Sequence, residues 1–196
     1  MKHSHAFSGL ALSAAFFLSA ASCVQISDPS AGASEPTTHS TNFATGAEAI
    51  SGSLDLVVST EATADADYGS KNIVPLWVED STGAFVKTLG VWAATRKKYL
   101  TSWISSQENS VVDGIAGATR ANHDNPLVVA WDGTFTDDTT KMKKDTYLLR
   151  GEITDHNGAG ETFSVSIDLS AGSVDPPAET TTPGFTSIDA AFTVSP

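Results

Sequence analysis

The sequence has little cysteine and little positive charge. Its 196 residues include one cysteine, Cys23, so an intramolecular disulfide cannot form. Lysine and arginine number 11 against 23 aspartate and glutamate residues, which gives a net charge of -12. Because neutralising phosphates requires clustered cations, this balance argues against a nucleic-acid partner. The sequence also lacks a nucleophile elbow, a phosphate loop and a redox cysteine pair, so it assigns no catalytic residue.

The longest apolar run, residues 6–21, is shorter than the roughly 20 residues that a membrane-spanning helix needs. It follows Lys2, and this order of a charge and then a short apolar run predicts a secretory signal peptide over residues 1–22. The run ends at the only cysteine and resembles a bacterial lipoprotein signal, with Ala20 where leucine or valine is usual. The resemblance implies a lipid on Cys23. Ordinary secretion and an uncleaved segment are the alternatives.

Residues 24–45 are dominated by serine, threonine, alanine, glycine and proline. Such a segment cannot bury enough apolar surface to offset the entropy lost on ordering. We therefore expect a lipidated cysteine and flexible tether over residues 23–48, followed by one folded domain over residues 49–196. The expected location is the bacterial cell envelope, periplasmic or on the outer surface, with the lipid bilayer as a partner through the acylated Cys23.

Period-two alternation of apolar and polar residues dominates the chain from Ala49 onward. Its centre is a predicted hairpin, in which Ile73–Val78 and Phe85–Trp92 flank the turn Glu79–Gly83. Further strands are expected at residues 54–58, 127–131, 146–153, 163–169 and 188–194. The spacing predicts an all-β protein with an immunoglobulin-like antiparallel β-sandwich of about seven strands.

Three local features refine this prediction. Pro75 cannot donate to a strand ladder, so it is expected at an edge, a bulge or a strand start. Apolar residues at helical spacing predict a short helix or crossover over Arg96–Ser105. His156-Asn157-Gly158 predicts a tight hairpin turn, since Asn-Gly is the strongest two-residue turn signal.

Four motifs occur in order: VPLWVEDSTGAFVKTLGVW, YLTSW, DGIAGAT and WDG followed by DTY. Together they resemble a bacterial family of predicted periplasmic proteins, domain of unknown function 2271, over Ile50–Pro196. The second half is also similar to the immunoglobulin-like module of flagellar hook-capping proteins. The first resemblance implies a periplasmic location and association with envelope systems for flavin transfer and for iron or haem handling.

Asp113–Thr119 resembles the site at which a periplasmic flavin transferase esterifies FMN onto threonine. Asp113, Gly117, Ala118 and Thr119 match that pattern, whereas Ala116 stands where a hydroxyl residue is usual. The resemblance implies FMN on the Thr119 hydroxyl. The alternative is a tight turn into the next strand, with Asp113 capping backbone amides.

Histidines and carboxylates give no recognised metal spacing. His39, His123 and His156 are scattered and are expected to be ordinary loop residues. Two acidic loops offer oxygen ligands that suit Ca²⁺, but neither has the glycine and terminal glutamate of a calcium loop. These loops contain Glu61, Asp65 and Asp67 in one case and Asp132, Asp137 and Asp138 in the other.

The four tryptophans could line a groove for a ligand or a sugar, although filling the core is their more usual role. They are Trp77, Trp92, Trp103 and Trp131.

We expect an envelope lipoprotein that acts as a non-catalytic binding or accessory module beside an envelope protein partner, in flavin- or iron/haem-related systems. Two alternatives stay open. One is a redox carrier with FMN on Thr119, and the other is a calcium-stabilised adhesion or scaffold domain.

Overall fold

The computed structural model describes residues 48–63, 67–107, 112–137, 139–170 and 182–194. The chain divides into two units, Met1–Thr37 and Thr38–Pro196, and the described residues all belong to the second. The predicted signal segment, Cys23 and nearly all of the predicted tether fall outside them. Within these ranges, no helix is long and apolar enough to cross a membrane.

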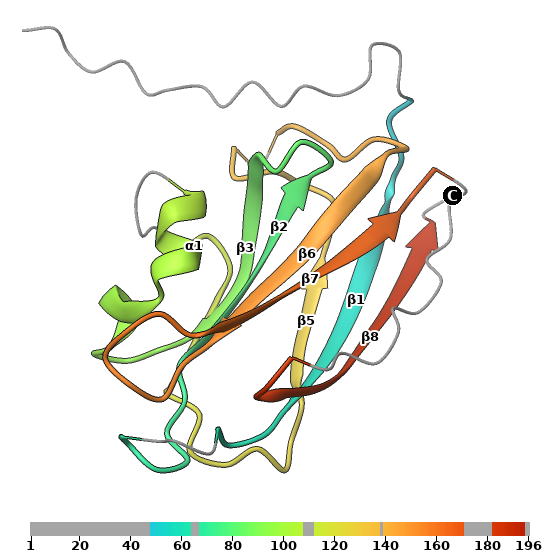
Figure 1. Cartoon of the computed structure of the whole chain (residues 1–196). Helices are drawn as coiled ribbons and strands as arrows, with labels where there is room; N and C mark the ends of the chain where they lie inside the picture. Colours follow the sequence, from blue (N-terminus) through green and yellow to red (C-terminus); the bar gives the residue numbers. More distant parts are fainter. Residues whose placement is uncertain (1–47, 64–66, 108–111, 138, 171–181, 195–196) are drawn as a thin grey trace, which may run out of the picture. The chain divides into compact units, whose positions relative to one another are not determined.

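Eight strands and two short helical segments make up the described part of the chain (Figure 1). In order they are β1 (Gly52–Thr60), β2 (Val74–Asp80), β3 (Phe85–Trp92), η1 (Lys97–Tyr99), α1 (Thr101–Ser106), β4 (Ile115–Gly117), β5 (Leu127–Trp131), β6 (Thr146–Ile153), β7 (Glu161–Asp168) and β8 (Phe185–Val194).

The strands form two sheets, one of three strands in the order β5-β1-β8 and one of five in the order β4-β3-β2-β6-β7. The predicted all-β sandwich with one short helical interruption is confirmed. The strand absent from the prediction is β4, which lies within Asp113–Thr119, the segment given as a flavin site or a tight turn. β4 also pairs with β3 in parallel, so the sandwich is not wholly antiparallel as expected. The immunoglobulin-like connectivity stays a prediction.

The predicted central hairpin is confirmed as β2 and β3, which pair antiparallel. Its turn is fixed by Asp80, whose Oδ1 accepts hydrogen bonds from the backbone N–H groups of Thr82 at 2.8 Å and Ala84 at 3.0 Å. Gly83 in this turn has a φ of 85°, a backbone conformation that residues other than glycine rarely adopt. The sequence Asp-Ser-Thr-Gly therefore determines where the hairpin reverses.

β2 lies between β3 and β6, and all seven of its side chains are buried. The ladder to β6 begins at Leu76 and Gly151, one residue after Pro75. Because proline has no N–H to donate, it is tolerated at the start of this central strand. Of the three positions expected for Pro75, the strand start is correct.

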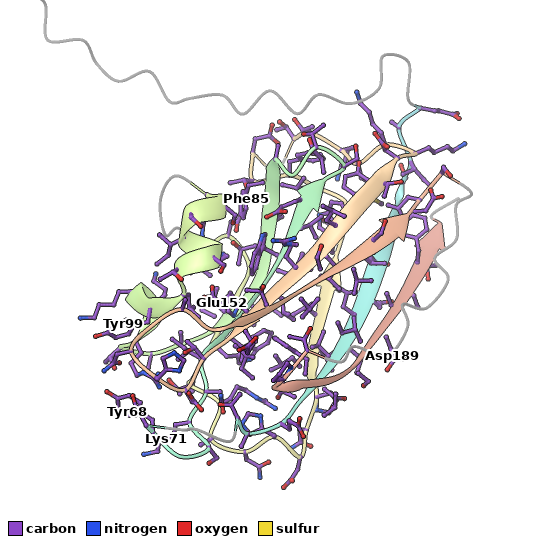
Figure 2. The ribbon with its side chains drawn as sticks, viewed as in Figure 1. Tyr68, Lys71, Phe85, Tyr99, Glu152 and Asp189 are labelled. Carbon is purple, nitrogen blue, oxygen red and sulfur yellow. The ribbon has the colours of Figure 1, made fainter. Side chains whose placement is uncertain are left out.

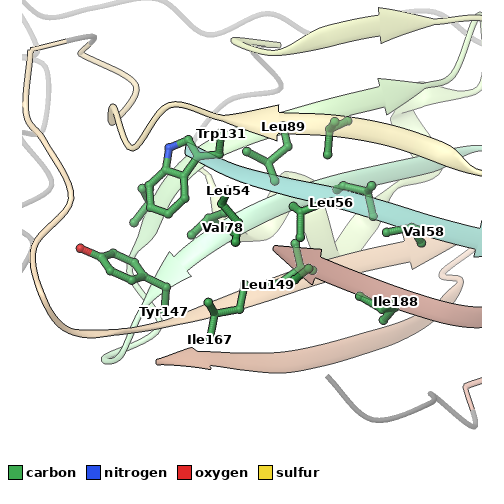
Figure 3. Close-up of a cluster of buried hydrophobic side chains, with 14 of the residues drawn as sticks. Leu54, Leu56, Val58, Val78, Leu89, Trp131, Tyr147, Leu149, Ile167 and Ile188 are labelled. Carbon is green, nitrogen blue, oxygen red and sulfur yellow. The ribbon is translucent and has the colours of Figure 1, made fainter. Parts of the chain in front are cut away.

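Two hydrophobic clusters lie on opposite faces of the five-stranded sheet. The larger, which we call the sandwich core, lies between the sheets; Figure 3 shows Leu54 and Leu56 of β1 with Val78 and Leu149 from the opposite sheet. The smaller, the helix-side core, lies on the other face and consists of Ile73, Trp77, Phe85, Val91, Leu100 and Trp103. Both faces of β2 are therefore covered, which explains its uninterrupted burial.

The helix predicted over Arg96–Ser105 is confirmed as η1 and α1. α1 has only six residues and no side-chain cap from its N-cap residue, Leu100. Instead, Oε2 of the fully buried Glu152 accepts the backbone N–H groups of Ser102 and Trp103, both at 3.1 Å. The carboxylate thus satisfies two amide groups that the start of a helix leaves without partners.

The connection between β6 and β7 differs from the prediction. β6 ends at Ile153 and β7 begins at Glu161, so the loop is longer than a two-residue turn, and Gly158 is not among the glycines with positive φ. Thr154 stabilises the loop, since its Oγ1 lies 3.3 Å from the carbonyl oxygens of His156 and Gly158. These local hydrogen bonds compete with the tight Asn-Gly turn.

Candidate functional site

The segment predicted to carry a flavin lies at an edge of the five-stranded sheet. Residues 115–117 form β4, which pairs with β3 and with no other strand of the described residues. Ile115, Ala116 and Ala118 are exposed, and the Ile115 side chain retains 50% of its accessible surface. The segment is thus both ordered by a parallel ladder and open to another protein.

Asp113 holds the start of this segment in place. Its Oδ1 accepts the backbone N–H of Thr88 at 2.9 Å, and its Oδ2 accepts the hydroxyl of Thr136 at 2.7 Å. One carboxylate therefore ties β3, the segment before β4 and the loop after β5 together. This agrees with the predicted alternative in which Asp113 binds backbone amides.

Gly117 and Thr119 follow along the same edge. A Cβ on Gly117 would lie 2.3 Å from Cδ1 of Trp92, so only glycine allows the indole to rest against β4 at this point. The half-buried Thr119 accepts the backbone N–H of Ala94 through its Oγ1 at 3.2 Å. Asp113, Gly117, Ala118 and Thr119 therefore lie on one segment at the edge of the sheet, residues 113–119, which we call the edge segment.

The tryptophans do not share one surface. Trp77 and Trp103 lie in the helix-side core and Trp131 lies in the sandwich core, each at most 1% exposed. Their indole N–H groups donate to Glu79 Oε1 at 2.8 Å, Thr88 Oγ1 at 3.0 Å and Thr134 O at 2.7 Å, respectively. Trp92 is half-buried beside the sandwich core. Three of the four residues proposed for a groove are thus core residues.

A set of contacts that sequence reasoning missed lies where β1 ends. We call this region the polar loop end and define it by residues 60–63, 67–72, 94–99, 118–125 and 154–160. Figure 2 labels three of its residues, Tyr68, Lys71 and Tyr99. These ranges belong to four loops, because residues 60–63 and 67–72 both lie in the connection between β1 and β2. Only the strand topology brings the four loops together.

Arg96 is the central clamp of the polar loop end. Its Nη1 donates to the carbonyl of Lys71 at 3.0 Å, and its Nη2 donates to the carbonyl of His156 at 2.7 Å. Its guanidinium also lies 4.0 Å from the ring centroid of Tyr68, whose hydroxyl accepts Asn157 Nδ2 at 2.7 Å. Cation–π stacking and two hydrogen bonds thus hold two loops at fixed positions.

The two histidines of the described chain both lie in the polar loop end. His123 Nε2 is 3.0 Å from the carbonyl oxygen of Ser70, and its Nδ1 is 2.8 Å from Thr60 Oγ1. Because a carbonyl can only accept, Nε2 donates to Ser70 O, and in the neutral ring Nδ1 accepts the Thr60 hydroxyl. His123 therefore joins the end of β1 to the loop before β2.

The second histidine, His156, pairs with a buried carboxylate. Its Nδ1 lies 3.0 Å from Oδ1 of Asp155, while Thr63 donates its hydroxyl to Oδ2 and accepts Asn72 Nδ2 at 3.1 Å. Burial of Asp155 opposes ionisation, but the hydrogen bonds from Thr63 and His156 outweigh it, so the pKa of Asp155 lies below its ordinary value. The carboxylate is thus a fixed negative charge in this network.

In the second acidic loop, Asp132 and Asp137 accept hydrogen bonds from backbone N–H groups and threonine hydroxyls of their own loop. Hydrogen bonds from Thr134 lower the pKa of Asp132, and hydrogen bonds from Thr140 and Thr139 lower the pKa of Asp137 to about 2. Asp65, Asp138 and His39 lie outside the described residues. Within those residues, no three histidine, cysteine or acidic side chains are grouped as a metal site would require.

Comparison with known proteins identifies the family. The family model DUF2271, described as a predicted periplasmic protein, matches residues 55–186, which is more than half of the chain. The match spans the hairpin β2–β3, the edge segment and the whole of the polar loop end. No curated protein and no solved structure matches the chain. The chain therefore belongs to the DUF2271 family of predicted periplasmic proteins.

Proposed function

We propose that this protein is a non-catalytic accessory module of the bacterial envelope, anchored by a lipid on Cys23, which presents the polar loop end to a protein partner. The periplasmic description of the family supports an envelope location. The position of the only cysteine directly after a signal-like apolar run supports the anchor. Both statements go beyond the family assignment and need their own test.

The direction in which β1 runs carries this proposal. The described chain begins beside the loop before β6, where Glu48 pairs with Lys144 at 2.8 Å and Ala49 bridges to Lys143. β1 then runs nine residues, about 30 Å, to Thr60 at the polar loop end. A tether attached before Glu48 would leave from one end of the sandwich, so the polar loop end would face away from the membrane.

The contacts within the polar loop end favour recognition over catalysis. Arg96 fixes two loop carbonyls, His123 holds Thr60 and Ser70, and Asp155 is tied to Thr63. These side chains rigidify the surface by binding each other. A rigid surface loses less conformational entropy when a partner binds, and a lipid anchor raises the effective concentration of the module near that partner.

The experiment has two parts, performed on the intact chain in its host. For the anchor, Cys23→Ser should move the protein from the membrane fraction to the soluble fraction and remove the mass of the lipid. For the polar loop end, a photo-crosslinking residue at Asn157 should give a discrete adduct, whereas the same residue at exposed Ser164 on β7 should not. A Cys23→Ser protein that stays in the membrane fraction contradicts the anchor. Equal adducts from both positions contradict the role of the polar loop end.

A flavin carrier is the second candidate function, favoured by the position of Thr119. The preceding residues are exposed along the edge segment, which gives a modifying enzyme access. The Thr119 oxygen accepts the Ala94 N–H, so its own proton is not needed for that hydrogen bond. An FMN attached there would supply one- and two-electron chemistry. The hydroxyl residue usual at position 116 is an alanine, which is the main departure from the pattern.

Co-expression with a flavin transferase tests this candidate. The expected result is in-gel flavin fluorescence and a mass gain equal to FMN, both lost in Thr119→Val. Thr95→Val is the matched control, because Thr95 is an exposed threonine on the neighbouring loop and should leave labelling intact. Absence of label, or a label that survives Thr119→Val, rules the candidate out.

A further inference from the structure

β5 is an edge strand without the usual protection. It pairs with β1 on one side only, and within the described chain no backbone group pairs with its other side. Its five residues, Leu127–Trp131, are all apolar, and Val128 keeps 61% of its accessible surface. Exposed edges are normally blocked by charges, prolines or bulges, because their free N–H and C=O groups attract other strands. None of these devices lies within β5.

The opposite sheet extends one strand further than the sheet that contains β5. β5 lies against β3, as shown by a Cβ on Gly90 that would come 3.3 Å from Cγ1 of Val129. β4 lies beyond β3, so no strand in the described part of the chain faces it across the sandwich. Ile115 shares a face of β4 with Gly117, and Gly117 faces the half-buried Trp92. The half-exposed Ile115 and Trp92 are therefore apolar residues on an inner face that lacks a cover.

We propose that a β-strand from a partner protein adds to β5 and lies over β4. We call this position the strand slot and define it by the outer edge of Leu127–Trp131, the inner face of Ile115–Gly117 and Trp92. Backbone hydrogen bonds to β5 provide the affinity, and every second side chain of the added strand packs on Ile115 and Trp92. The added strand is apolar at alternate positions, which matches the period of an extended chain.

The same geometry argues against a second copy of this chain as the occupant. A symmetric β5–β5 pair needs the two strands about 4.8 Å apart. In each copy, β4 extends the opposite sheet by one strand beyond β3, and β3 is the strand that faces β5. In a symmetric pair, both β4 strands would therefore have to lie between the two β3 strands, where one strand spacing leaves no room for them. Two copies would also each carry a net charge of -12. A single partner strand flanked by lysine or arginine fits the slot and is attracted by the acidic protein.

The strand slot is independent of the proposed function. It lies along the side of the sandwich formed by β4 and β5, whereas the polar loop end is made of loops. If no peptide binds at the strand slot, the proposal for the polar loop end is unaffected. If cross-linking at the polar loop end fails, the proposal for the strand slot is unaffected.

Hydrogen exchange of the intact protein with the synthetic peptide KKTVTVTVTKK tests the proposal. With the peptide at about ten times its Kd, alternate amides of β5 should exchange about tenfold more slowly. The amides of β7 and β8, the two edge strands outside the strand slot, should not change. The fluorescence of Trp92 should shift with the same Kd. The same peptide with N-methyl groups on alternate residues should give no protection, because it cannot complete the ladder.

Variants at two exposed positions complete the test. Ile115→Lys places a charge in the strand slot and should weaken peptide binding at least about tenfold, since a buried unpaired charge is costly. Ser164→Lys on β7 is the matched control at another edge and should bind as the native protein does. Unchanged exchange at β5, equal binding of the N-methylated peptide, or slower exchange that depends only on protein concentration would each overturn the proposal. The last result would indicate a second copy instead.

Discussion

Tyr147 combines a fully buried ring with a titratable hydroxyl. Its ring packs edge-on against Trp131 with centroids 5.3 Å apart, and its hydroxyl accepts the backbone N–H of Lys143 at 2.8 Å. Burial, together with the negative charges of Asp145 and Asp80, raises the pKa of Tyr147 to about 12. The hydrogen bond from Lys143 opposes this rise without cancelling it.

This pKa predicts a loss of stability at high pH. Below pH 10 the tyrosine is protonated in both states, so it contributes no pH dependence. Between about pH 10 and 12 the unfolded chain releases the proton and the folded chain keeps it, so the free energy of unfolding falls as the pH rises. Urea unfolding measured across this range should show a shallower decline in Tyr147→Phe than in the native protein. Identical slopes in Tyr147→Phe and the native protein would contradict the assignment.

At the scale of the element, α1 shows how a short helix depends on its surroundings. A helix of six residues is not stable alone, because the cost of nucleation exceeds the gain from its few hydrogen bonds. Two tertiary contacts compensate: Trp103 is buried in the helix-side core, and Glu152 of β6 accepts the N–H groups at the start of the helix.

Removing the carboxylate should therefore destabilise the domain through α1. Glu152→Ala leaves Ser102 N and Trp103 N without their acceptor, and Gly160 N loses a weaker bond of 3.4 Å. We expect a loss of about 2–4 kcal/mol in the free energy of unfolding from urea titration, with a smaller loss for Glu152→Gln. Glu161→Ala, an exposed glutamate on β7, is the control and should change stability by less than about 0.5 kcal/mol. Similar values for both positions would show that the cap does not matter.

At the scale of the whole molecule, both hydrophobic clusters lie within the residues expected to form one domain. The described members of the sandwich core run from Ile50 to Ala190, and those of the helix-side core from Ile73 to Trp103. A chain that begins at Glu48 therefore keeps every one of these side chains. It also keeps the ion pair between Glu48 and Lys144.

Deleting residues 1–47 should leave the thermal unfolding midpoint within about 2 °C of that of the intact protein. Circular dichroism of both proteins under the same conditions measures this difference, and Leu56→Ala in the shortened chain provides a positive control. Leu56 is fully buried, so its truncation should cost about 2–5 kcal/mol and lower the midpoint clearly. A large drop on deletion alone would place part of the folding unit before Glu48.

Much of the fold is predictable from the sequence because alternation survives wherever one face of a strand is exposed. β7 is an example: Phe163 and Ile167 are buried while Ser164 and Ser166 are exposed. β2 is the counterexample, since both of its faces are covered and its pattern is a continuous buried run. β4 was not predicted, because a strand of three residues that includes a glycine shows no alternation of apolar and polar residues. Its pairing with β3 also depends on the hydrogen bond between Asp113 and Thr88, which the sequence pattern does not show.

The polar loop end could not be predicted, for a different reason. Thr63 and Asp155 are 92 positions apart, and Thr60 and His123 are 63 apart, so no local spacing records their contact. Each residue alone looks like an ordinary loop residue. The candidate flavin segment stays a prediction from sequence motifs, and its place on a sheet edge beside Trp92 came from the structure.

The sequence by itself determined the β-sandwich class, the central hairpin, the helical interruption and the family, because these depend on periodicity, turn residues and ordered motifs. Only the tertiary structure decided that three tryptophans are core, that four loops meet at the end of β1, and that β4 extends past β5. Those facts follow from which strands pair with which, and strand pairing is a long-range outcome that no short stretch of sequence specifies.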